Sequence, residues 1–221
     1  MSGATYPQTE RSTLRRVPEL GSREREEVHA ILDAGLVAHV GIAVDDQPTV
    51  IPMGYARDGD RLLLHGGVAS RLLKHLRSGA EVCVTVTLLD GLVVARSGFS
   101  SSMNYRSVVL FGRGRPVEGE EAKARALDAL TDHLIPGRSK EYREHLSKEI
   151  AATEVIEIPL EEATAKSRSG PPHDLEKDLA LDGIWAGVIP LSLEAGPPEP
   201  SPDLAEGIEI PPSVRDWRRG D

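Results

Sequence analysis

The chain has 221 residues, 39% of them apolar, with a mean hydropathy of −0.26 and 26 basic against 35 acidic residues, a net charge of −9. This balance predicts a soluble globular protein and argues against nucleic-acid or membrane partners, because both need a broad basic face. Cys83 is the single cysteine, no disulfide can form within the chain, and no apolar leader or long apolar run occurs, so we expect a cytoplasmic protein.

The two ends of the chain differ in composition from its middle. Residues 1–16 are polar and basic without periodicity, and residues 195–221 carry six prolines among acidic side chains. Segments of this kind rarely bury enough apolar surface to fold. We therefore predict a flexible N-terminal lead over 1–16, a domain over 17–194 and a Pro-rich acidic tail over 195–221.

The predicted domain begins with a helix and continues with short strands. Residues 22–35 place apolar side chains on one stripe between Ser22 as an N-terminal cap and Gly35 as a stop. Strand-like runs follow at 38–44, 49–56 and 61–67, separated by turn signals at 45–48 and 58–60. Their close spacing indicates hairpins.

The second half of the domain repeats this alternation of strands and helices. A helix is predicted at 69–77, and strands resume at 81–89, 92–98 and 107–114, with Asp90-Gly91 as a turn. Charged helices at 118–135 and 140–150 lead to strands at 153–160 and 185–191. Strands at close spacing without βαβ alternation favour a mainly β, antiparallel barrel with helices packed outside.

Standard nucleotide-binding and metal-binding motifs are absent. No G-x-G-x-x-G follows a strand and no G-x-x-x-x-G-K-[ST] occurs. The seven histidines show no paired ligand spacing, so no metal site is predicted. Cys83 lies in an alternating strand, where we interpret it as a packed thiol rather than a nucleophile.

The segment HGGVASRLLKHL, residues 65–76, has the composition of an anion site. A strand ends at His65, two glycines let the backbone turn, and a helix begins near Ser70 with Arg71 and Lys74 in its first turns. Free N–H groups, a hydroxyl and a guanidinium there suit a phosphate. Taken alone, the same pattern more often marks an ordinary capped helix with a solvated basic face.

A second polar segment opens the strand SSMNYRSVVLFGRG, residues 101–114. An amide, a phenol, a guanidinium and a hydroxyl follow one another at 104–107, directly before the apolar run 108–111. Exposure to solvent at the start of a strand explains one or two polar residues. Four in succession indicate that they hold something.

Together these segments resemble the FMN-binding split-barrel family, the pyridoxamine 5'-phosphate oxidase-like flavoproteins, and within it the branch of nitroimidazole-resistance-type proteins. The resemblance covers about residues 17–192 and rests on TVIPMGYA, HGGVASRLLKHL, SMNYRSVVLFG, and KSRSGPPHD with WAGVIPL, in this order. It implies a six-stranded antiparallel split β-barrel with flanking helices, a bound FMN and a homodimer.

The resemblance also implies which residues contact the cofactor. The backbone of Ile51, Pro52 and Met53 would meet the edge of the isoalloxazine ring. His65 and Gly66, at the end of the next strand, would flank the ribityl chain and the phosphate.

The phosphate motif of the family matches only in part. Ser70 and Arg71 correspond to its Ser-Arg pair, but Leu72 stands where the family oxidases commonly carry lysine. Lys74, one turn along the helix, would have to supply the missing charge.

The polar strand entry completes the predicted cleft. By resemblance, Asn104, Arg106 and Ser107 would point toward the flavin, whereas Tyr105 would face the other way. Trp185 would line the substrate side, and packing in a dimer interface is an equally good interpretation of this residue.

The activity that the resemblance implies is FMN-dependent reduction or oxidation of an unidentified small molecule. The C-terminal strand lacks the Arg-x-His of true pyridoxamine 5'-phosphate oxidases, so oxidation of vitamin B6 is disfavoured. Three alternatives stay open: a haem-binding or haem-handling protein of the same barrel with His65 or His173 as axial ligand, a flavin-binding module without catalysis, and a deazaflavin cofactor.

Overall fold

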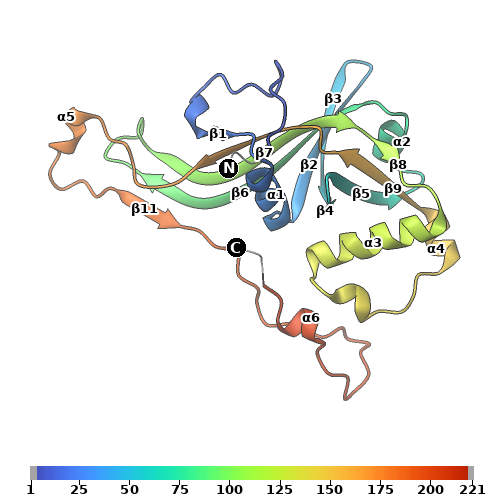
Figure 1. Cartoon of the computed structure of the whole chain (residues 1–221). Coiled ribbons are helices and arrows are strands. Elements are labelled where there is room, and N and C mark those ends of the chain that lie inside the picture. The colour runs from blue at the N-terminus through green and yellow to red at the C-terminus, as the bar shows by residue number, and fades with distance from the viewer. Residues whose placement is uncertain (1–3, 219–221) are drawn as a thin grey trace.

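Two antiparallel sheets form the centre of the molecule in the computed structural model, which describes residues 4–218 (Figure 1). The seven-stranded sheet comprises β1 (Gly21–Ser22), β2 (Val37–Val44), β3 (Gln47–Gly54), β6 (Glu81–Val94), β7 (Ser102–Arg113), β10 (Glu162–Arg168) and β11 (Gly187–Pro190). The four-stranded sheet comprises β4 (Ala56–Asp58), β5 (Arg61–Gly67), β8 (Arg115–Pro116) and β9 (Thr153–Pro159). The mainly β class is confirmed, and the strands expected in one six-stranded barrel are distributed over these two sheets.

The order of strands places β3 at the edge of the larger sheet. This order is β1-β10-β7-β6-β2-β3, and β11 pairs with the outer part of β6. β2 and β3 are joined by Asp45 and Asp46, both with positive φ, of 50° and 59°. Such backbone angles are typical of the two-residue hairpin turn, which confirms the predicted turn.

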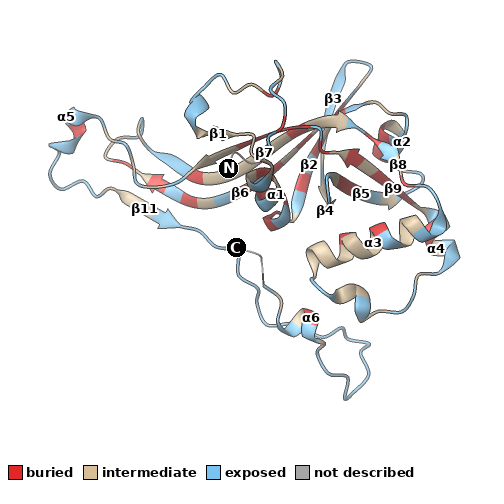
Figure 2. Cartoon of the chain, viewed as in Figure 1, coloured by how far each residue is buried: buried red, intermediate tan, exposed pale blue. Residues whose placement is uncertain are grey.

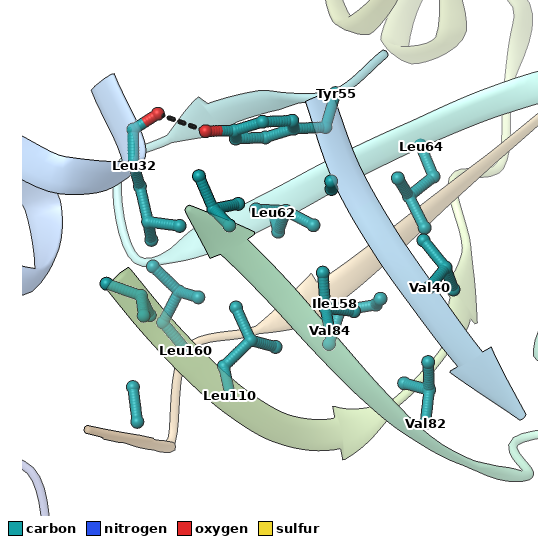
Figure 3. Close-up of a cluster of buried hydrophobic side chains, with 14 of the residues drawn as sticks. Leu32, Val40, Tyr55, Leu62, Leu64, Val82, Val84, Leu110, Ile158 and Leu160 are labelled. Carbon is teal, nitrogen blue, oxygen red and sulfur yellow. Dashed lines mark hydrogen bonds between the residues drawn. The ribbon is translucent and has the colours of Figure 1, made fainter. Parts of the chain in front are cut away.

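The core lies between the two sheets (Figure 3). Val84 and Leu110 from the larger sheet meet Leu62 and Ile158 from the smaller one, and all four are fully buried. Figure 2 shows the same pattern as buried segments along the inner strands. Strand alternation explains it, because every second residue of each strand faces the opposite sheet.

The helices are α1 (Arg25–Ala34), α2 (Arg71–Arg77), α3 (Glu120–Leu134), α4 (Ser147–Ala152), α5 (Glu176–Leu179) and α6 (Pro212–Arg215), with the 3-10 turns η1 (Pro18–Leu20) and η2 (Arg138–Lys140). Four helices, α1 to α4, pack against strands of the two sheets, whereas α5 lies on the segment beside β11 and α6 lies in the C-terminal tail (Figure 1). No helix among residues 4–218 is both long and apolar enough to cross a membrane. α1 ends at Gly35 as predicted, but its predicted cap is wrong: Ser22 pairs with Ala165 in the sheet and Glu24 takes the N-cap position.

The predicted turn at Asp90-Gly91 is also wrong, because β6 runs through it with only an irregularity in its pairing with β7. Gly91 is buried, and a Cβ atom there would lie 3.1 Å from the carbonyl oxygen of Ile189 in β11. The glycine therefore permits close approach of a neighbouring strand rather than a change of chain direction.

Two other elements differ from the sequence prediction. The helix expected over 140–150 is replaced by η2 and the short α4, which begins only at Ser147. β10 was missed because its sequence, EATAKSR, contains few β-branched residues, yet it pairs with β7 from Glu162 to Arg168. Long-range pairing outweighs weak local propensity here.

The described part of the N-terminal lead packs on the barrel instead of extending as a flexible segment. Tyr6 is fully buried, and its hydroxyl lies 2.9 Å from Nε2 of His29. Arg11 donates to the buried Glu162 of β10, with Nη2 2.7 Å from a carboxylate oxygen. Residues 1–3 of the predicted lead lie outside the described residues.

The end of the predicted tail packs against the domain close to the C-terminal end of α3. The indole nitrogen of Trp217 donates to the carbonyl oxygen of Leu134 at 2.8 Å, and the backbone N–H of Ser213 donates to Glu141 at 3.2 Å. The region before α6 has no helix or strand from residue 191 to 211. Residues 219–221 of the predicted tail lie outside the described residues.

The outer halves of β6 and β7 extend beyond the barrel as an arm, residues 89–104, together with the segment 168–193 that holds α5 and β11 (Figure 1). Leu92 of β6 lies opposite Met103 of β7 and Ile189 of β11. These three side chains are 41%, 48% and 47% exposed. The arm therefore carries an apolar row, Leu92, Met103 and Ile189, that residues 4–218 leave exposed.

Candidate functional site

β3 carries the residues predicted to meet a flavin ring. Among residues 4–218 it pairs only with β2, so the backbone along its other side is not engaged in a sheet. Ile51 and Met53 are half-buried and pack on the core, whereas Pro52 is exposed. Proline is tolerated on an edge strand because its missing N–H breaks no ladder. The strand can thus offer backbone groups to the edge of a planar ligand.

The predicted phosphate segment forms the expected strand end, turn and helix. Ser70 is the N-cap of α2, and its hydroxyl oxygen accepts from the N–H of Leu73 at 3.4 Å. The leucines of α2 are buried, while Arg71 and Lys74 are exposed. Neither cation pairs with a carboxylate within the described part of the chain. The predicted cap is confirmed, and two positive charges remain available beside it.

His65 and Gly66 lie directly before this helix at the end of β5. His65 reaches the surface, but the surrounding protein partly desolvates its ring and lowers its pKa, which favours the neutral imidazole. A Cβ atom on Gly66 would lie 3.0 Å from Cδ1 of Leu73. The glycine therefore lets α2 approach the strand end.

The polar entry of β7 is engaged within the chain. Asn104 is 8% exposed, and its amide nitrogen donates to the carbonyl oxygen of Gly170 at 3.2 Å. Arg106 makes a two-point contact with Asp90, at 3.0 and 2.9 Å. Ser107 donates to the carbonyl oxygen of Lys166 at 3.1 Å. Three of the four polar side chains therefore connect β7 to neighbouring segments of the fold.

The four residues also divide between the two faces of β7. Strand alternation places Asn104 and Arg106 on the face that continues into the buried core, and places Tyr105 with Ser107 on the other face. Ser107, which was expected to point toward the flavin with Asn104 and Arg106, therefore lies on the opposite face of β7 from both.

Sequence reasoning missed the partners of these side chains. Arg168 donates to the amide oxygen of Asn104 and, at 3.1 Å, to the carbonyl oxygen of Pro171. Arg96 and Asp174 form a second contact, in which the Asp174 side chain is only 2% exposed. The motif KSRSGPPHD contains three of these residues, Arg168, Pro171 and Asp174, but nothing local in it indicates which partners they bind.

Trp185 lies on the arm, away from the phosphate segment. It precedes β11, which pairs with the outer half of β6, whereas α2 lies at the opposite end of the sheet (Figure 1). Its indole packs over Gly187, where a Cβ atom would come within 2.8 Å of the ring. At 65% exposure it belongs to the uncovered surface of the arm.

The remaining reactive side chains fit structural roles. Cys83 is half-buried, and burial raises the pKa of its thiol, which disfavours the nucleophilic thiolate. Within residues 4–218 no three His, Cys, Asp or Glu side chains converge as a metal site.

Comparison with known proteins identifies the family. The family model described as pyridoxamine 5'-phosphate oxidase matches residues 24–167, more than half of the chain. The chain belongs to the pyridoxamine 5'-phosphate oxidase family. This confirms the family resemblance of the four sequence segments, and the fold with its split-barrel architecture agrees with it.

Two solved structures resemble the chain over nearly its whole length. Flavocytochrome Anf3 from Azotobacter vinelandii is 42% identical, with a TM-score of 0.90, over 96% of this chain and 98% of that one. The FAD and haem binding protein from Mycobacterium smegmatis is 43% identical, with a TM-score of 0.85, over 89% and 96%. The first match covers 96% of the chain, so neither the arm nor the tail can lie wholly outside it.

Two further similarities cover less of the chain, one to a solved structure and one to a curated sequence. A proposed 5-nitroimidazole antibiotic resistance protein from Bacteroides thetaiotaomicron is 24% identical over 66% of this chain and 85% of that one, with a TM-score of 0.56. The uncharacterized protein RA0666 from Rhizobium meliloti is 29% identical over 89 residues. That match covers 40% of this chain and spans about half, 52%, of the curated relative.

Proposed function

We propose that the protein is a flavin-binding oxidoreductase that acts on a small molecule. The observation that carries this proposal is the similarity, over 96% and 89% of the chain, to proteins named for flavocytochrome character and for FAD and haem binding. The edge of β3 and the helix start at Ser70 support it, because they offer backbone groups and unpaired cations to a ring and a phosphate.

FMN is the cofactor we propose for this site. Ile51, Pro52 and Met53 would orient the ring, and Ser70 with Arg71 would hold the phosphate, assisted by Lys74. FAD contains the same ring and ribityl phosphate, so the same residues would serve its FMN portion. When bound, the flavin supplies the hydride and electron chemistry, and the protein supplies position and electrostatics.

A haem is a second candidate ligand, favoured by the names of both full-length relatives. Haem requires a neutral imidazole or another axial ligand and an apolar surface for the macrocycle. His65 and His173 are the two candidates that the sequence suggests. A protein with both cofactors would pass electrons between flavin and haem.

A homodimer completes the proposal, because the apolar row of Leu92, Met103 and Ile189 is left exposed by the part of the chain that the structure describes. Exposed apolar patches of this kind commonly mark protein interfaces. Flavin binding without catalysis would leave this assembly intact but give no turnover with any electron donor.

An absorbance spectrum of the purified protein tests the cofactors directly. Flavin bands are expected, with a Soret band in addition if haem is bound. Mass analysis of the material released by denaturation then separates FMN from FAD and from a deazaflavin. Colourless protein that takes up neither FMN nor FAD on titration would contradict the flavin proposal.

A further inference from the structure

A cavity lies between the tail, where residues 198–214 lead into α6, and two residues of the preceding domain, Arg138 and Glu141. Figure 1 shows this part of the tail below the domain, away from both α2 and β3, so the proposed flavin site does not use it. We propose that the cavity binds a small organic cation with an apolar body, a ligand of the alkylammonium class.

The cavity has the size and the lining of a small-molecule site. Its volume is about 730 Å³, within the range of roughly 300–1,000 Å³ that ligand sites occupy. Seven of its twelve lining residues are prolines or aliphatic residues, and polar side chains stand at the others. A mainly apolar wall with a few polar groups is the composition that holds and orients small ligands.

Three aliphatic side chains of the tail line this cavity and stay uncovered by residues 4–218. Leu204, Ile208 and Ile210 are 49%, 59% and 48% exposed, within seven residues of sequence. Single exposed aliphatic residues are normal in a soluble protein, but a group that converges on one hollow marks a binding surface. The apolar body of a ligand would cover all three.

The wall of the cavity is held in place by prolines and hydrogen bonds. Four prolines between residues 197 and 202 restrict the backbone, and the N–H of Leu204 donates to the carbonyl oxygen of Ser201 at 3.0 Å. At the other end, the N–H of Ser213 donates to the carboxylate of Glu141 at 3.2 Å, and its hydroxyl donates to the same group. A restrained wall loses less conformational entropy when a ligand binds.

The charges of the wall favour a cation over an anion. Arg138 is the only basic residue among the twelve that line the cavity, and its guanidinium already contacts Glu141 at 3.3 Å. Glu199 and Glu209 also line it, and neither has an ion pair or a side-chain hydrogen bond within the described part of the chain. An ammonium group would therefore meet two free carboxylates, whereas an anionic ligand would meet the same two charges as repulsion.

Calorimetric titration of the full chain with three ligands of equal length tests this assignment. Octylamine, which is protonated at neutral pH like a lysine side chain, supplies the cation, octanoate the anion and 1-octanol the uncharged control. Octylammonium should bind at least about fivefold more tightly than 1-octanol and at least about tenfold more tightly than octanoate.

Substitutions at exposed positions of the tail locate the binding. Glu199→Gln combined with Glu209→Gln should weaken octylammonium at least about fivefold and leave 1-octanol unchanged, because the charge is lost and the shape is kept. Glu206→Gln, in the same segment but outside the cavity wall, is the matched control and should bind as the wild type does. Ile208→Ala should weaken octylammonium and 1-octanol equally, at least about threefold, because it removes apolar wall.

Two outcomes would overturn the inference. One is a wild type that binds octylammonium no more tightly than octanoate, or binds neither. The other is a double glutamine variant that keeps the full affinity for octylammonium, which would place the binding elsewhere on the chain. Flavin content does not enter either comparison, so binding of octylammonium in the predicted order supports this inference even where the flavin proposal fails.

Discussion

β6 and β7 run through both the barrel and the arm, and their side chains differ sharply between the two regions. In the barrel, Val84 and Leu110 face each other at 0% exposure. In the arm, Leu92 and Met103 face each other in the same two strands at 41% and 48%. Both regions show apolar alternation, and the opposite sheet covers the inner face in the barrel, whereas in the arm the face with Leu92 stays exposed although Val93 on the other face is buried. An apolar strand residue is stabilising only where something covers it.

The largest expected effect is a difference in the free energy of unfolding between a variant in the barrel and a variant in the arm. Leu110→Ala should lower the free energy of unfolding by about 3 kcal/mol, because it opens a cavity in a packed core. Leu92→Ala on the neighbouring strand should cost less than about 1 kcal/mol at protein concentrations where the chain is monomeric. Urea denaturation of both variants measures the difference. Equal losses would mean that the arm is as well covered as the barrel.

The next effect concerns the binding of FMN at the start of α2. Arg71→Ala should weaken FMN binding by about 2 kcal/mol, roughly 30-fold, because it removes a charge-assisted contact from the phosphate. Riboflavin, which lacks the phosphate, should bind both proteins equally, and Lys74→Ala should cost about 1 kcal/mol for FMN. Fluorescence titration measures all three. If Arg71→Ala and Lys74→Ala weaken FMN and riboflavin equally, or weaken neither, residues 65–76 form an ordinary capped helix and do not hold the phosphate.

A weaker effect is expected on the dissociation constant of the homodimer that we propose covers the apolar row of the arm. Leu92→Asp should raise the dissociation constant of a homodimer at least about tenfold, because it places a carboxylate in the apolar row with Met103 and Ile189. Sedimentation over a range of concentrations gives the constant. Val50→Asp, an exposed residue on the edge strand β3, is a control for added charge. If the wild type is monomeric at micromolar concentration, a second subunit does not cover the apolar row.

The smallest effect concerns the packed N-terminal lead. Contacts with Arg11 and Thr9 lower the pKa of Glu162 below its usual value of 4.5. Their stabilisation is therefore present above about pH 4.5 and is lost as the pH falls through the lower folded-state pKa. It should amount to less than about 1 kcal/mol, because Arg11 is 44% exposed.

Hydrogen exchange of residues 4–16 checks this dependence on pH. Protection should fall on acidification in the wild type, after correction for the intrinsic rates. Arg11→Ala should show weaker protection at neutral pH and little further loss in acid. A wild-type lead that stays equally protected below the folded-state pKa of Glu162 would show that Tyr6 alone holds it.

The sequence by itself determined the features that depend on neighbouring residues. Strand alternation, the turn at Asp45-Asp46, the stop at Gly35 and the cap at Ser70 with buried leucines behind it all follow from local backbone and side-chain chemistry. Together with the order of four segments, they were enough to predict the family and the mainly β fold.

The tertiary structure alone decided which side chains meet. Asn104 binds Gly170, 66 positions away, and Arg11 binds Glu162, 151 positions away, because sheet register brings these segments together. Local chemistry predicted a turn at Gly91, where pairing with β7 and β11 keeps the strand continuous, and a flexible lead, whose described part packs against His29 and Glu162. A short motif fixes the backbone preference and the charge of a residue, but the pairing of strands far apart in the chain fixes its neighbours.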